Sequence, residues 1–80
     1  MEFTRNEKRA IVQCISSAAN ENQINRLLPQ LLSNLEINSS NEMEDLWDIP
    51  VTEVEMMQIL RFDNSPEKRR IFESLMDIIS

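Results

Sequence analysis

The sequence predicts an all-α fold: a small, compact bundle of four main helices with a short helical turn near Trp47, in one domain of residues 1–80. Three observations predict this class. The chain contains no glycine, apolar residues recur at helical spacing in several segments, and capping residues precede those segments. Tight turns and sheet bulges depend on glycine, so its absence disfavours a β fold. A chain of this length buries only about two thirds of its unfolded surface, so every apolar face needs cover.

The first helix is expected to begin after Thr4, because Thr4 and Glu7 have the spacing of a capping box. It should fray near Asn20. Its predicted apolar stripe consists of Ile11, Ile15 and Ala18, with Val12, Cys14 and Ala19 beside it. Cys14 is the only cysteine, and we expect it to be a small buried residue and not a reactive thiol.

The second helix has the clearest amphipathic pattern, but Pro29 lies inside it. A proline in a helix interior removes one backbone donor and costs roughly 3 kcal/mol. The cost falls if Asn25 is the N-cap, because Pro29 then lies near the first turn. We therefore predict a helix over residues 26–36 after a polar break at 20–23, with a bend if it starts earlier. Its apolar residues are Ile24, Leu27, Leu28, Leu31, Leu32 and Leu35.

Residues 38–41 are predicted to form a loop, and residues 42–48 one short helical turn that ends before Pro50. Met43, Leu46 and Trp47 are the apolar residues of this turn. Two interpretations of Trp47 stay open. Its ring can fill the core with the indole N–H bonded to a carbonyl, or it can anchor a protein partner.

Residues 51–79 are predicted to form a helical hairpin around which the rest of the chain packs. Thr52 and Glu55 suggest a capping box for its first helix, and Asp63 with Asn64 should end that helix. Ser65 is then the predicted N-cap of the last helix, with Pro66 at the first helical position. Arg69 and Glu73 are expected to pair at i, i+4 on this helix.

Residues 49–60 (IPVTEVEMMQIL) and 65–79 (SPEKRRIFESLMDII) resemble the later helices of TerB-like (tellurite-resistance type) domains. Residues 7–25 are similar in layout to that family's helix, acidic loop and helix cap. The family's acidic Asp-Gly metal loop would fall at Asn20 and Glu21, where both the Asp and the Gly are missing, and a second loop would follow Ile79. The resemblance therefore implies a shortened member without the metal site, a stress-related or phage-related adaptor with no activity attached.

Several chemistries lack the residues they need. The chain has no His and no Tyr, so nucleophilic triads are excluded, and we expect no enzyme activity. Zinc is disfavoured by the single Cys, and calcium by the absence of an EF-hand pattern, so we expect no metal and no cofactor. No secretion signal and no apolar run long enough to span a membrane are evident, which predicts a cytoplasmic protein.

Charge gives the best indication of function. The net charge is −6, and residues 27–60 contain seven acidic residues but no Lys or Arg. This distribution disfavours direct binding to nucleic acid or to anionic membranes and favours a basic protein partner. We predict an adaptor that docks a protein through an apolar patch flanked by this acidic segment. The candidate partner-binding residues are Glu42, Glu44, Asp45, Trp47, Asp48 and Met56.

Two alternatives stay open. The chain can be an acidic inhibitor that imitates nucleic acid and occupies a basic groove, or a structural subunit that folds as a homodimer. The dimer is suggested because the predicted hairpin carries more apolar residues than the second helix alone covers. Its predicted interface consists of Phe62, Phe72, Met76 and Ile79.

Overall fold

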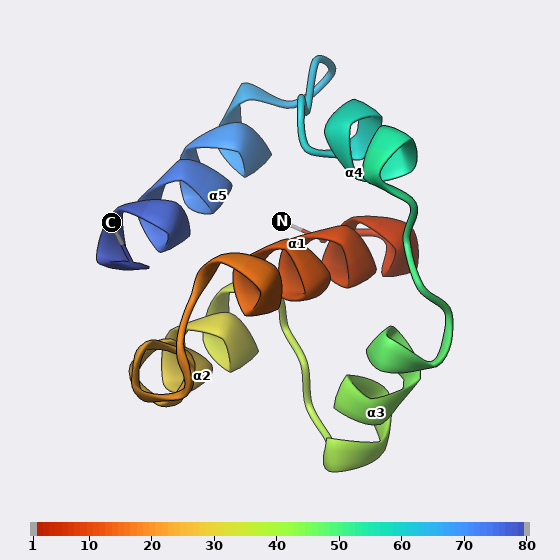
Figure 1. The fold of residues 1–80 in the computed structure, drawn as a ribbon. Coiled ribbons are helices and arrows are strands. Elements are labelled where there is room, and N and C mark those ends of the chain that lie inside the picture. Colours follow the sequence, from red (N-terminus) through yellow and green to blue (C-terminus); the bar gives the residue numbers. More distant parts are fainter. Residues whose placement is uncertain (1, 80) are drawn as a thin grey trace.

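One helix, α1 (Arg5–Ala18), runs through the middle of the molecule, and four others surround it (Figure 1). The structure is a computed structural model that describes residues 2–79. The described residues form helices and connecting turns only, with extents of 30 × 26 × 25 Å, so the predicted compact all-α class is confirmed. The surrounding helices are α2 (Glu21–Asn34), α3 (Ser40–Asp48), α4 (Glu53–Ile59) and α5 (Pro66–Ile79).

The short turn predicted near Trp47 is a full helix, α3, so residues 2–79 form five helices and not four with a turn. Ser39 caps α3 by accepting a hydrogen bond from the Glu42 N–H at 3.1 Å. This cap starts the helix two residues earlier than predicted, inside the segment that was expected to be a loop. The helix ends at Asp48, directly before Ile49 and Pro50, as predicted.

The predicted hairpin does not form as a packed pair. Helix α4 lies against α1, whereas α5 packs mainly on α2 and also on α1, and within residues 2–79 α4 and α5 make no close backbone contact. The reason is that α4 has only seven residues, none of them buried, so it offers no face wide enough to cover α5. The organising element is therefore α1 and not the 51–79 segment.

Helix α2 begins at Glu21, five residues before the predicted start, and ends at Asn34. Asn20 is its N-cap, and Asn20 and Gln23 form a reciprocal capping box with both hydrogen bonds at 2.9 Å. Pro29 consequently lies inside the helix. Satisfying two helix-end donors at Asn20, and gaining a further turn, outweighs the single backbone bond that Pro29 removes.

The other predicted helix starts are confirmed. Thr4 forms the full capping box with Glu7, and Thr52 accepts a hydrogen bond from the Glu55 N–H at 3.2 Å. The second bond of a complete box, in which the Glu55 carboxylate would accept from the Thr52 N–H, does not form in the described residues. Ser65 accepts from the Lys68 N–H at 3.4 Å, with Pro66 at the first helical position.

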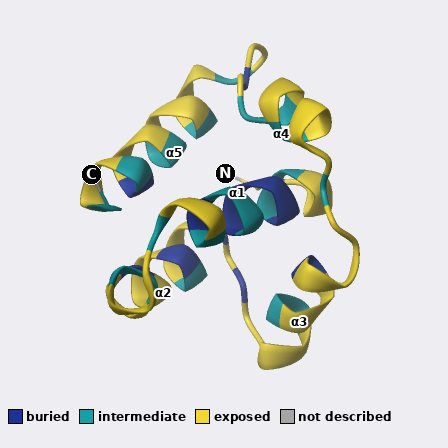
Figure 2. Ribbon diagram, in the orientation of Figure 1, coloured by how far each residue is buried: buried dark blue, intermediate teal, exposed yellow. Residues whose placement is uncertain are grey.

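The hydrophobic core surrounds α1, and the middle turns of α1 are the most deeply buried part of this helix (Figure 2). Ala18, predicted to belong to the stripe, is exposed instead. Cys14 is half-buried, and burial raises the pKa of its thiol, which favours the unreactive neutral form. The buried apolar cluster consists of Phe3, Ile11, Val12, Ile15, Leu27, Leu31, Leu35, Ile37, Leu46, Phe62 and Leu75.

An ion pair joins the start of α1 to α5. Lys68 Nζ donates to Glu7 Oε1 at 2.7 Å, and the same ammonium lies 5.5 Å from the centre of the Phe3 ring. Burial alone would raise the pKa of Glu7. The hydrogen bonds from Lys68 and from the Thr4 N–H, together with the Lys68 charge, outweigh burial and lower the pKa of this carboxyl below its ordinary value of 4.5.

Substituting Glu7→Gln is expected to lower the free energy of unfolding at neutral pH by roughly 1 kcal/mol, because Gln keeps the cap but loses the charged hydrogen bond. A carboxyl with a lowered folded-state pKa stabilises the fold above its unfolded pKa, and loses this contribution as pH falls through the folded pKa. The difference from the unmodified protein should therefore shrink as pH falls below the ordinary carboxyl pKa of 4.5. Urea titrations at neutral pH and at a series of lower pH values measure it. In the control, Glu73→Gln removes the exposed pair with Arg69 (3.2 Å) and should cost at most about 0.5 kcal/mol.

The end of α2 uses a left-handed residue that is not glycine. Glu36 has φ 54°. Its N–H donates to the Ser33 carbonyl at 3.3 Å, and the next N–H, of Ile37, donates to the Leu32 carbonyl at 3.0 Å. These two bonds are the pattern of a Schellman motif, whose left-handed position favours glycine. The turn folds Ile37 back onto α2, where its side chain is buried.

Glu36→Gly is expected to raise the free energy of unfolding by about 0.5–1 kcal/mol, since it removes the left-handed strain and a negative charge at the negative end of the helix dipole. Glu36→Ala is the matched control, because it removes the charge but keeps the Cβ. Thermal and urea unfolding of both variants separate the two effects. A Gly variant that is less stable than the Ala variant would contradict the assignment.

Candidate functional site

Two side chains from α1 hold the C-terminal end of α3, which has no basic residue of its own in its last turn. Gln13 Nε2 donates to the Leu46 and Ile49 carbonyls, both at 2.9 Å, and Gln13 Oε1 accepts from the Val51 N–H at 2.9 Å. One amide thus satisfies a free carbonyl of α3 and two backbone groups of the linker to α4.

Arg9 lies one turn before Gln13 on α1 and is only 6% exposed. Its Nη1 donates to Asn6 Oδ1 at 3.3 Å, and its Nη2 lies 3.5 Å from the Asp45 carbonyl oxygen. A cation near the last carbonyls of α3 complements the helix dipole, although Arg9 Nε has no hydrogen-bond partner among the described residues.

Glu42 holds the other end of α3. Its Oε1 accepts from Lys8 Nζ at 2.9 Å, and its Oε2 accepts from the Asn38 N–H at 3.2 Å. The hydrogen bond from Lys8 and the one from the Asn38 N–H lower the pKa of this carboxyl. Glu42, predicted to bind a partner, is therefore engaged within the chain, where it ties the 35–39 connection and α3 to α1.

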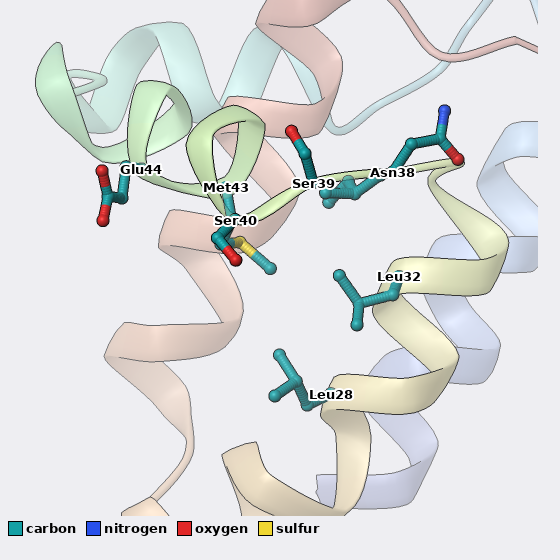
Figure 3. Close-up of a pocket in the computed structure, with 8 residues that line it drawn as sticks. Leu28, Leu32, Asn38, Ser39, Ser40, Met43 and Glu44 are labelled. Carbon is teal, nitrogen blue, oxygen red and sulfur yellow. The ribbon is translucent and has the colours of Figure 1, made fainter.

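The space between α2 and α3 is an apolar groove of about 510 Å³, which we call the α2–α3 groove. It exists because both helices pack on α1 but make no close backbone contact with each other in the described part of the chain. Figure 3 shows Leu28 and Leu32 projecting from α2 toward Met43 of α3. Glu44 lies at the rim, with its carboxylate turned away from the two leucines. The lining residues are Leu28, Leu32, Ile37, Asn38, Ser39, Ser40, Met43 and Glu44.

The four acidic residues of the predicted partner-binding set fall into two groups on α3. Glu42 and Asp45 face α1, and Asp45 pairs with Arg5 at 3.6 Å. Glu44 and Asp48 are exposed and have no ion-pair partner among residues 2–79. The unneutralised acidic charge of α3 is therefore on its outer side.

Trp47 does not fill the core. It is 47% exposed, whereas its neighbour Leu46 is fully buried and takes the core position. Met56, from the other end of the predicted site, is half-buried on α4 and lies outside the groove lining. Helix α4 instead exposes Val54 and Met57.

The four residues predicted to form a dimer interface pack within the single chain. Phe62 is buried between Phe3 and Phe72, with both ring pairs 6.1 Å apart. Phe72, Met76 and Ile79 are half-buried against the core. A dimer through α4 and α5 stays a prediction, and the only large hydrophobic residue that α5 exposes is Ile78.

Sequence reasoning missed the leucines of the groove, because it assigned them to the core stripe of the second helix. One signal was present: a stripe of six apolar residues is wider than the face that one packing partner covers. Leu27 and Leu31 are buried, whereas Leu28 is 39% exposed and Leu32 half-buried on one side of that stripe.

Within residues 2–79, no three acidic or cysteine side chains lie close enough together to hold a metal ion, and no helix is long and apolar enough to cross a membrane. Scans against family models, curated proteins and solved structures find no match to this chain. The TerB-like resemblance stays a prediction.

Proposed function

We propose that the protein is a non-catalytic interaction module that binds a protein partner in the α2–α3 groove. The observation that carries this proposal is the groove itself, which leaves Leu28 exposed and Met43 half-buried beside Glu44, whose charge has no ion-pair partner in the described residues. Apolar grooves between helices are common sites of helix and peptide recognition. The lack of His and Tyr supports a role without catalysis.

Acidic surface around an apolar centre favours a basic partner, since complementary charge accelerates association and excludes acidic competitors. The nucleic-acid mimic receives less support from the geometry. Glu42 and Asp45 are paired with Lys8 and Arg5, so α3 presents fewer free carboxylates than the sequence count suggests.

Leu28→Asp is expected to abolish capture of the partner from a lysate of the source cells, because a charge replaces an apolar wall of the groove. Ile78→Asp is the matched control: Ile78 is also 39% exposed, but on α5. Quantitative mass spectrometry should find a protein retained by the unmodified chain and by Ile78→Asp, and lost with Leu28→Asp. Equal retention by all three contradicts the groove as the binding site.

A further inference from the structure

Trp47 lies on α3 one helical turn beyond the α2–α3 groove. Met43, which lines the groove, and Trp47 are four residues apart, and side chains at that spacing lie on the same face of a helix. The Trp47 ring is half exposed, and no hydrogen bond or ring contact engages it among the described residues. Helix α3 therefore presents two apolar contact points, one inside the groove and the next one turn further along.

Acidic residues accompany these two contact points at the same spacing. Glu44 lies at the groove rim, and Asp48 follows it by four residues, so the two carboxylates share the solvent side of α3. The cations supplied by α1 do not reach them, because Arg5 and Lys8 pair with Asp45 and Glu42. An apolar stripe and an acidic stripe thus run side by side along α3.

We infer that the occupant of this surface is a basic amphipathic helix of another protein. It lies along α3, inserts one large apolar side chain between Leu28, Leu32 and Met43, and places a second, one turn later, against Trp47. Its Lys or Arg residues pair with Glu44 and Asp48. This inference rests on the proposed function and specifies the class of partner.

Three other occupants fit less well. An extended strand would need a sheet edge for its backbone, and residues 2–79 form no sheet. A second copy would bring like charges together at the α3 surface. A small apolar ligand fits the size of the groove, but it leaves Trp47 and the acidic stripe uncovered.

The test uses a peptide of about 15 residues, long enough to form a helix, with leucines at i and i+4, lysines at the positions flanking the leucines, and no Trp. Trp47 is the only tryptophan of the protein, so its emission reports binding directly. We expect a blue shift as the ring is covered, with a Kd below about 100 µM at physiological salt. Leu28→Asp should weaken binding at least about tenfold, the loss of one buried leucine side chain, and Ile78→Asp should not.

Two comparison peptides distinguish the failures. One has the same composition with leucines at alternating positions, and the other has glutamate in place of lysine; both should bind at least about tenfold more weakly. Glu44→Lys should weaken the binding of the basic peptide and reduce its salt dependence.

If either comparison peptide binds as tightly as the basic helical peptide, and Leu28→Asp weakens that binding, the helical or basic character of the partner is wrong and the groove proposal stands. If no peptide shifts the emission of Trp47, the inference fails. If binding is indifferent to Leu28→Asp, the groove proposal fails as well.

Discussion

Ile15→Ala is expected to destabilise the protein by about 2–4 kcal/mol, the largest effect that we predict for a single substitution. Ile15 lies on the central helix α1 and is 1% exposed. Removing its side chain beyond the Cβ leaves a cavity at the point where the surrounding helices converge, and the short chain has little capacity to close it. A domain of this length has a total stability of only about 4–12 kcal/mol, so this single substitution removes a large share of it.

Ile78→Ala on α5 provides the comparison, because the same atoms are removed at a site that is 39% exposed. It should cost less than about 1 kcal/mol. Urea unfolding followed by far-ultraviolet circular dichroism measures both variants under identical conditions. Similar losses for the two substitutions would show that α1 is not the centre of the core.

Gln13→Glu is expected to cost about 2 kcal/mol, because the new carboxylate keeps the bond from the Val51 N–H but cannot donate to the Leu46 and Ile49 carbonyls. It also places a negative charge at the negative end of the α3 dipole. The destabilisation should first affect α3 and the linker to α4, and not the whole fold. Hydrogen exchange should therefore show faster exchange in α3 and in the linker to α4, with the amides of α2 nearly unchanged.

Gln30→Glu tests whether the added charge alone explains such a loss, since Gln30 is exposed on α2 and its side chain makes no hydrogen bond in the described residues. We expect it to change stability by less than about 0.5 kcal/mol. Because α3 forms one wall of the α2–α3 groove, Gln13→Glu should also weaken partner binding even though Gln13 does not line the groove. Unchanged exchange in α3 would show that the amide does not position this helix.

Local signals predicted the helices well where a capping residue and an apolar stripe agreed. Thr4, Thr52 and Ser65 each precede a helix that the structure contains. The prediction was wrong where two local rules conflicted. At α2 the rule against interior proline was given more weight than the Asn20 cap, and the structure resolves the conflict the other way.

The arrangement of the helices could not be predicted from these signals. The position of each helix depends on how the apolar faces of the five helices fit together. Capping residues and apolar periodicity carry no information about this fit. The same holds for the groove, which exists because α2 and α3 both pack on α1 and diverge from each other. Trp47 illustrates the difficulty: the sequence left a core and a partner-binding interpretation open, and in the structure Leu46 is buried whereas Trp47 is 47% exposed.

The most direct test of the α2–α3 groove as the docking surface is a nuclear magnetic resonance titration of isotope-labelled protein with the partner captured from the source cells. We expect the earliest and largest changes at the methyl groups of Leu28, Leu32 and Met43 and at the indole N–H of Trp47. The methyl signals of Val54 on α4 and Ile78 on α5 should not shift, although both residues are exposed. Chemical-shift changes confined to α4 and α5, with the methyl signals of the groove unchanged, would contradict the proposed function.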